Sequence, residues 1–141
     1  MTPLVVDASI TIKWFVPEVH SAEATRFLTG PYELSAPDFL LSEAANVLWR
    51  KVRRGELDET DAMEVLTDVA ESPTDFQPSA PLVERALRIA IATDRTVYDS
   101  LYLALALQLG CQLVTADRRL YNAPQGGPLA STLIWVEDVP S

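Results

Sequence analysis

The apolar residues of the chain fall into short continuous runs and longer stretches with helical spacing. Short runs bounded by turn residues predict strands, and apolar positions three and four residues apart predict helices. Strands are predicted at Leu4–Asp7, Gln112–Thr115 and Thr132–Val136, with short extended pieces at Glu33–Ala36 and near Phe76. Helices are predicted from Ser21 to Leu28, from Asp38 to Arg53 before Gly55, from an Asp58 cap to about Glu71, from Pro81 to Thr93, and from about Val97 to Leu109 before Gly110.

The alternation of strands and helices predicts the fold class. Strands separated by helices are joined by right-handed crossovers into a mainly parallel sheet that carries helices on both faces. The runs "LVV", "QLVT" and "LIWV" are continuously apolar, as expected of parallel strands buried on both sides. We therefore predict one α/β domain over residues 1–141, with its site at the carboxyl ends of the strands.

Charge is distributed unevenly along the chain. A formal net charge of −9 argues against a general nucleic-acid binder, because phosphate contacts require clustered Lys and Arg. Eight of the twenty acidic residues fall between Glu56 and Asp75, whereas four of the eleven basic residues lie in "RKVRR", residues 50–54. Two interpretations of this basic stripe stay open: a solvated helix end that complements the helix dipole, and an RNA contact.

The chain is predicted to be soluble and cytoplasmic, with no membrane segment. A single cysteine, Cys111, excludes a disulfide framework and indicates a buried, inert thiol in a reducing compartment. No Lys- or Arg-flanked apolar stretch opens the chain. The longest apolar run, Leu101–Leu109, is too short to span a bilayer.

Four acidic residues occupy positions where a charge is unusual. Asp7 and Asp117 each follow a predicted strand, in "LVVD" and "LVTAD". Glu43 has apolar residues as its helical neighbours, and Asp99 lies in the first turn of a helix that is apolar nearly all round. Taken singly, each has an ordinary explanation, such as a cap or paired core charge for Asp7, a boundary residue for Glu43 and a dipole-stabilising acid for Asp99.

Taken together, the four acids predict a metal site. Acidic residues are rarely buried unless they are paired or bind a metal, and the nearby bases are limited to Arg118 and Arg119. Convergence would raise some of the carboxyl pKa values, and a divalent cation is the usual relief. His20 is the only histidine and Cys111 the only cysteine, so the ligands are oxygens, which favour Mg²⁺ or Mn²⁺ over Zn²⁺.

A hard cation at the open end of a parallel sheet suits phosphoryl chemistry. One histidine, remote from the acids in sequence, disfavours a Ser/His/Asp nucleophile. The only paired glycines lie in "NAPQGGP", which indicates a turn and not a phosphate-binding loop.

Four segments carry a resemblance to a known family: "VVDASITIKWF", "LLSEAANVLWR", "TVYDSLYLALALQLG" and "LVTADRRL". In order and spacing they resemble the motifs of PIN-domain proteins, most of all the VapC-like ribonuclease toxins of toxin-antitoxin systems. The resemblance covers Leu4 to about Leu120 and implies a PIN-like domain with metal-dependent endoribonuclease activity. It implies that four acids, Asp7, Glu43, Asp99 and Asp117, bind Mg²⁺ or Mn²⁺ and activate the attacking water. The hydroxyls beside them, Ser9 and Thr115, would support the site.

The hydroxyls have alternative explanations, because Ser9 can simply cap a helical turn and Thr115 can simply end a strand. The resemblance also implies an RNA substrate, a homodimer and a cognate antitoxin whose peptide covers the acidic groove. The acidic segment 56–75 would repel RNA, so we expect it to face away from the site or to contact a partner. Loop 122–131 is assigned no role. The aromatic side chains of Trp14, Phe15 and Trp49 suit core or dimer contacts better than base stacking.

Two alternatives to a nuclease are carried forward. A metal-dependent phosphatase of the haloacid-dehalogenase type also places an aspartate after its first strand. That type requires a second aspartate where this chain has Ser9, and a later lysine, whereas only Lys13 and Lys51 exist. The other alternative is a non-catalytic module whose acidic pocket receives a basic peptide.

Overall fold

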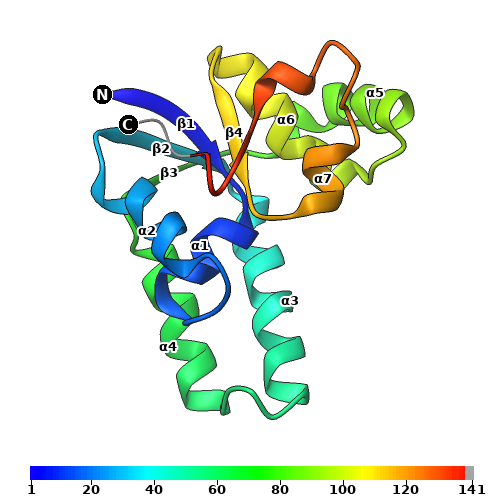
Figure 1. Ribbon diagram of the computed structural model, residues 1–141. Coiled ribbons are helices and arrows are strands. Elements are labelled where there is room, and N and C mark those ends of the chain that lie inside the picture. The colour runs from blue at the N-terminus through cyan, green and yellow to red at the C-terminus, as the bar shows by residue number, and fades with distance from the viewer. Residues whose placement is uncertain (139–141) are drawn as a thin grey trace.

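A parallel sheet forms the centre of the molecule. The structure is a computed structural model that describes residues 1–138, and its five strands lie in the order β3-β2-β1-β4-β5, all parallel (Figure 1). The predicted α/β class with a parallel sheet is confirmed, while residues 139–141 of the predicted domain lie outside the described residues. The strands are β1 (Thr2–Val6), β2 (Tyr32–Pro37), β3 (Thr74–Gln77), β4 (Gln112–Thr115) and β5 (Leu133–Trp135).

Helices fill the connections between the strands. Asp58 caps its helix as predicted, because its side chain accepts a hydrogen bond from the Asp61 N–H at 2.7 Å. Two helices, the first and the last, were not predicted; both are short, and both are capped by an acid of the expected site. The helices are α1 (Ala8–Phe15), α2 (Ser21–Thr29), α3 (Phe39–Arg53), α4 (Glu59–Ala70), α5 (Val83–Thr93), α6 (Val97–Leu109) and α7 (Arg118–Asn122), with 3₁₀ turns at Ala80–Leu82 and Ala130–Thr132.

The helices form layers around the sheet. Helices α1 and α2 pack together on one side, and α6 packs on β1, β2 and β4 from the other side with α5 outside it (Figure 1). Helices α3 and α4 pack against each other as a hairpin that extends away from the sheet (Figure 1). The predicted coverage of both faces is therefore present, and within residues 1–138 no helix is long and apolar enough to cross a bilayer.

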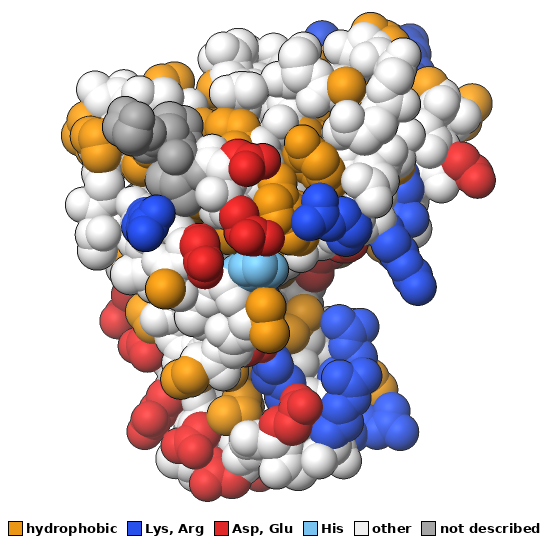
Figure 2. All heavy atoms as spheres, in the orientation of Figure 1, with side chains coloured by type: hydrophobic (Ala, Val, Ile, Leu, Met, Phe, Trp, Pro, Cys, Tyr) orange, Lys and Arg blue, Asp and Glu red, His pale blue; other side chains and the backbone are white. Residues whose placement is uncertain are grey.

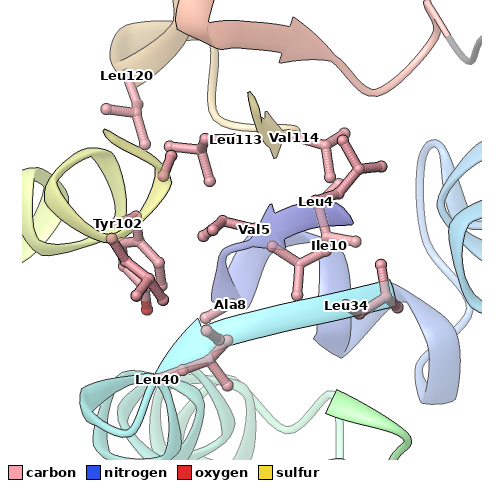
Figure 3. Packing of buried hydrophobic residues seen from close by; sticks show 14 of the residues in the cluster. Leu4, Val5, Ala8, Ile10, Leu34, Leu40, Tyr102, Leu113, Val114 and Leu120 are labelled. Atoms are coloured by element: carbon pink, nitrogen blue, oxygen red, sulfur yellow. The ribbon is translucent and has the colours of Figure 1, made fainter. Parts of the chain in front are cut away.

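The core lies between β1, β4 and the helices that cover them. Figure 3 shows Val5 and Leu113 from the sheet beside Tyr102 of α6, with Ile10 and Leu34 close to β1. Outside this centre, Trp14 and Phe15 pack against the core, whereas Trp49 is 53% exposed. The Cys111 thiol is partly buried, and burial raises its pKa, which agrees with the predicted inert thiol.

The sheet changes direction of growth between β1 and β4. From β1 the chain adds β2 and β3 on one side, and it then crosses back to add β4 and β5 on the other. Ligand sites of open parallel sheets lie at such a reversal, outside the carboxyl ends of the strands. Asp7 leaves β1 at this point, and the parallel register pairs Val6 with Val114, one residue before Thr115.

Candidate active site

Asp7 is the buried centre of the site. Its side chain is 3% exposed, although it stands at the end of β1 and at the N-cap of α1. The two carboxylate oxygens accept hydrogen bonds from two hydroxyls, Ser9 Oγ at 2.5 Å and Thr115 Oγ1 at 2.5 Å, and Oδ1 also accepts from the Ile10 N–H at 3.3 Å. Asp7 is thus fixed from both α1 and β4.

The same two hydroxyls connect Asp7 to the segment that carries Asp117. Ser9 Oγ accepts from the Ala116 N–H at 2.9 Å, and Thr115 Oγ1 accepts from the Asp117 N–H at 3.0 Å. The capping position of α1 belongs to Asp7, whereas Ser9 lies inside the helix. Each hydroxyl therefore joins the carboxylate of β1 to the backbone after β4.

Asp117 is held at the beginning of α7. It is the N-cap of this helix, and its Oδ1 accepts from the Arg119 N–H at 3.0 Å and the Leu120 N–H at 3.4 Å. Acidic residues are favoured at a helix N-terminus because the backbone dipoles point their positive ends there. The short helix α7 thus orients the Asp117 carboxylate next to Asp7.

Glu43 reaches the site from α3, one turn after the helix begins. Its Oε1 accepts a hydrogen bond from the Tyr102 hydroxyl of α6 at 2.9 Å, and its carboxylate also bonds to the backbone of Ala8. Tyr102 is fully buried, and in Figure 3 its oxygen points toward Ala8 and Leu40, where α1 and α3 begin. Three helices therefore meet at the Glu43 carboxylate.

Asp99 forms an ion pair with Arg95. It lies in the first turn of α6, whose N-cap Thr96 accepts from the Asp99 N–H at 3.0 Å. The Arg95 guanidinium donates to Asp99 Oδ2 at 2.7 Å, with the two side chains 24% and 16% exposed. Arg95 Nε is buried and has no hydrogen-bond partner among the described residues. The guanidinium is thus bound at one end and unsatisfied along its inner edge.

The four carboxylates influence one another electrostatically. Burial raises the pKa of Asp7 to about 7; the hydrogen bonds from Ser9 and Thr115 oppose this rise, and the charges of Glu43 and Asp117 add to it. Burial also raises the pKa of Glu43, with Asp99 and Asp117 contributing in the same direction. Mutual repulsion of this kind is expected only where acidic side chains converge.

The buried phenol of Tyr102 reports the same negative field. Burial and the charges of Glu43, Asp7 and Asp99 raise its pKa well above the usual value. The phenol therefore keeps its proton and remains a donor to Glu43. The charges of the four predicted acids thus act on one another near the carboxyl ends of β1 and β4, with Asp99 acting on Glu43 and Tyr102.

The donor set fits a hard divalent cation, although the carboxylates are occupied by protein donors. Among residues 1–138, no three His, Cys, Asp or Glu side chains are arranged as a group that could hold an ion. Each carboxylate is instead hydrogen-bonded to hydroxyls, backbone amides or Arg95. All the donor atoms are carboxylate oxygens, the ligands preferred by Mg²⁺ and Mn²⁺.

Two residues of the site were not predicted from the sequence. Tyr102 and Arg95 lie on α6 or just before it, at three residues after and four residues before Asp99. The spacing of Arg95 and Asp99 by four residues is a signal for an ion pair. The contact between Tyr102 and Glu43 spans 59 residues and has no local signal.

Comparisons with known proteins identify relatives of this chain. The family model of the PIN domain matches residues 4–125. Ribonuclease VapC3 of Pyrobaculum aerophilum is 38% identical over 119 residues, covering 83% of this chain and 91% of that protein. Exonuclease VapC9 of the same organism is 34% identical and covers 81% of this chain and 84% of that protein. The crystal structure of PAE2754 from Pyrobaculum aerophilum superposes with a TM-score of 0.69 at 28% identity, covering 96% of this chain and 85% of that one.

Proposed function

Because this chain belongs to the PIN domain family, we propose that it is a metal-dependent endoribonuclease, the toxin of a toxin-antitoxin pair. The proposal rests above all on one observation. The charges of Asp7, Glu43, Asp99 and Asp117 act on one another near the carboxyl ends of parallel strands, and the pKa of the most buried one, Asp7, is raised to about 7. Perturbed carboxylates in such a place are typical of active sites.

The four carboxylates would hold Mg²⁺ or Mn²⁺. When bound, such a cation supplies the Lewis acidity that activates a water and offsets charge on the phosphodiester. Ser9 and Thr115 fix the direction of the Asp7 carboxylate, and the Tyr102 hydroxyl fixes that of Glu43. Arg95 balances part of the charge of Asp99. These contacts preorganise the acids, so that little reorganisation is needed when the substrate arrives.

The proposal includes partners. An RNA substrate, a cognate antitoxin and a homodimer follow from the family resemblance, and the cytoplasm is the compartment in which RNA and antitoxin would be met. Of the two alternatives, the haloacid-dehalogenase phosphatase is not supported by the family match. A non-catalytic acidic pocket would not require the hydrogen-bonded support found at Asp7 and Glu43.

Cleavage assays test the proposal directly. Purified protein is incubated with structured RNA in Mn²⁺, Mg²⁺ or EDTA, beside the Asp7→Asn and Asp99→Asn variants. We expect cleavage in either cation, none in EDTA, and none by the variants. Cleavage that ignores EDTA and survives both substitutions contradicts the metal-nuclease proposal, and hydrolysis of p-nitrophenyl phosphate without RNA cleavage supports the phosphatase.

A circular RNA distinguishes the proposed endonuclease from an exonuclease, the activity named for the VapC9 relative of Pyrobaculum aerophilum. An endonuclease linearises a circular substrate, whereas an exonuclease leaves it intact because it requires an end. We expect the circular and linear forms to be cut at comparable rates. Degradation confined to the linear form would replace the proposed endonuclease with an exonuclease.

A further inference from the structure

Lys and Arg side chains gather on two sides of a recess in the surface. Figure 2 shows one group over the C-terminal half of α3 and another beside α7, with Asp and Glu gathered over α4 on the side away from the recess. The acid segment 56–75 includes α4, so its expected orientation away from the site agrees with this view. The surface is therefore acidic on one side of the helical hairpin and basic on the side that adjoins the candidate site.

Helical spacing aligns the first group with the site. Arg50 and Arg54 follow Glu43 by seven and eleven residues, which places them within about 20° of it around the helix axis. At 1.5 Å per residue they lie about 10 and about 16 Å from Glu43 along the axis. All three side chains thus form one stripe, which begins in the acid cluster and continues outward as two cations.

The second group follows Asp117 directly. Arg118 and Arg119 form the first turn of α7, and both are exposed. The Arg118 guanidinium stacks on the Trp135 ring at 3.7 Å from its centroid. This stacking restricts Arg118 and leaves the guanidinium edges free to donate, since stacking uses only the face of the group.

None of these four arginines is neutralised by a neighbour. Within residues 1–138, no carboxylate lies within salt-bridge distance of Arg50, Arg54, Arg118 or Arg119. The contrast within α3 is clear, because Lys51 pairs with Glu18 at 2.8 Å and points to the α1 side. In a chain with twenty acidic residues, unpaired cations beside an acid cluster indicate a surface that meets an anionic partner.

We propose that the recess between Arg50 and Arg54, at the C-terminal end of α3, and Arg118 and Arg119 of α7 is the path of a single-stranded RNA. The four guanidinium groups bind its phosphates on either side of the acid cluster. This inference rests on the proposed ribonuclease function and specifies how the substrate is held. Phosphate is favoured over a protein carboxylate as the ligand, because two cations in line along a helix match the repeated charges of a backbone.

Binding measurements in the non-cleaving Asp7→Asn protein test this path. The probe is a fluorescein-labelled single-stranded RNA, and its affinity is measured by anisotropy over a range of salt concentrations. The double variant Arg50→Glu/Arg54→Glu is compared with Arg26→Glu/Arg85→Glu, which changes the net charge equally at exposed arginines of α2 and α5. Arg119→Glu tests the opposite side of the recess.

We expect the α3 pair to weaken binding by about 10-fold or more and to reduce the salt slope by about 1.4, or about 0.7 for each lost phosphate contact. Arg119→Glu should weaken it by about threefold, and the control pair by less than about twofold. Equal loss in the control pair, or no loss in the α3 pair, overturns the path. Tighter binding of poly-L-glutamate than of RNA also overturns it and indicates an acidic protein partner.

Failure of the path can be separated from failure of the ribonuclease proposal. Cleavage by the otherwise unchanged protein in Mn²⁺ is measured independently of the binding series. If this protein cleaves RNA while the α3 pair leaves affinity unchanged, only the path is wrong. If it does not cleave, the ribonuclease proposal is wrong, whereas the anisotropy comparison still reports whether the recess binds RNA.

Discussion

Glu18 is a partly buried carboxylate with positively charged neighbours, whereas Asp7 is a fully buried carboxylate with negatively charged neighbours. Glu18 follows α1, and its oxygens are bound by Lys13 at 3.0 Å and Lys51 at 2.8 Å. Burial alone would raise its pKa, but the hydrogen bonds and charges of Lys51 and Lys13 lower it below the usual value. Burial raises the pKa of Asp7 to about 7; the hydrogen bonds from its two neutral hydroxyls oppose this rise, and the charges of Glu43 and Asp117 add to it.

The difference separates a carboxylate whose charge is compensated by two lysines from one whose charge has no such partner. Glu18 joins α1 and α3 through its two lysines, and both ends of the interaction are satisfied. The Asp7 cluster has four carboxylates and one guanidinium, Arg95, and therefore retains excess negative charge. A buried charge without compensation costs stability, and proteins keep it where function requires it.

Neutralising either carboxylate should produce the largest changes. Asp7→Asn should reduce RNA cleavage by about 10³-fold or more, because a ligand of the expected cation is lost. In EDTA at pH 8 the same variant should be more stable by about 2 kcal/mol, since the buried charge is gone although an amide cannot serve both hydroxyls equally. Cleavage rates and thermal melting measure the two effects.

Glu18→Gln is the matched control and should behave in the opposite way. Its stability should fall by about 1–2 kcal/mol, because two lysines lose their counter-charge in a partly exposed site. Cleavage per folded molecule should not change. A marked fall in the melting temperature of Asp7→Asn would instead assign Asp7 a structural role like that of Glu18.

The two clusters should respond to pH in opposite directions. The folded pKa of Asp7, about 7, lies above its usual value of 3.8, so stability is lost as pH rises from about 4 to 7 and the unfolded chain alone releases the proton. The loss should be about 3 kcal/mol, after allowance for partial hydration of the site. Glu43, whose pKa is also raised, acts in the same direction.

Glu18 produces the opposite slope at lower pH. Its folded pKa is lowered below 4.5, so its contribution is present above that pH and is lost as pH falls through the folded pKa. The cation-free protein should therefore be most stable between about pH 4 and 5, and denaturant titrations between pH 3 and 9 measure this. Asp7→Asn should remove most of the decline between pH 5 and 7, and an unchanged decline would contradict the raised pKa.

The position of the site was predicted mainly from the acidic residues that follow the strands. Asp7 and Asp117 each follow a continuously apolar strand, and parallel strands bring such ends to one edge. Glu43 and Asp99 were found because a charge on an apolar helix face is anomalous. The contacts that hold these acids could not be found in this way, since Thr115 meets Asp7 across 108 residues and Tyr102 meets Glu43 across 59.

The missed helices have a related cause. Segment 8–15, "ASITIKWF", is short and rich in β-branched and aromatic residues, which favour strands when taken alone. Its helical state depends on Asp7 as N-cap and on packing against α2 and α3. The cap alone is a weak sequence signal, and the packing cannot be seen in the local sequence. The Glu18 cluster was likewise invisible, because Lys51 lies 33 residues away.

A divalent cation should stabilise the protein through the Asp7 cluster and leave the Glu18 cluster unaffected. Mn²⁺ at about 100 times its Kd should stabilise the protein by about 2.7 kcal/mol, because binding favours the folded state. The corresponding rise in melting temperature, about 8 °C, should be absent in Asp7→Asn and Asp99→Asn and retained in Glu18→Gln. An equal rise in all four proteins would show that the ion binds elsewhere.

The smallest expected effect concerns the phenol that orients Glu43. Tyr102→Phe removes only the hydroxyl that donates to Glu43 at 2.9 Å, while the Ala8 backbone contact remains. Residues that orient metal ligands commonly change affinity, so Mn²⁺ binding measured by calorimetry should weaken by about 10-fold. The melting temperature without cation should change little. When Glu43 loses the Tyr102 donor, its carboxyl group can bind a proton and so avoid leaving a buried charge without a hydrogen bond.

Tyr98→Phe provides the control on the same helix, since Tyr98 is 59% exposed and stacks on Phe39. It should bind Mn²⁺ like the unchanged protein. Saturating Mn²⁺ should restore most of the cleavage by Tyr102→Phe, because the substitution alters how Glu43 is held and leaves every carboxylate in place. If Tyr102→Phe binds Mn²⁺ normally, Glu43 is positioned by the α1 backbone alone. The Tyr102 hydroxyl would then have only a structural role, like that of Lys13 and Lys51 at Glu18.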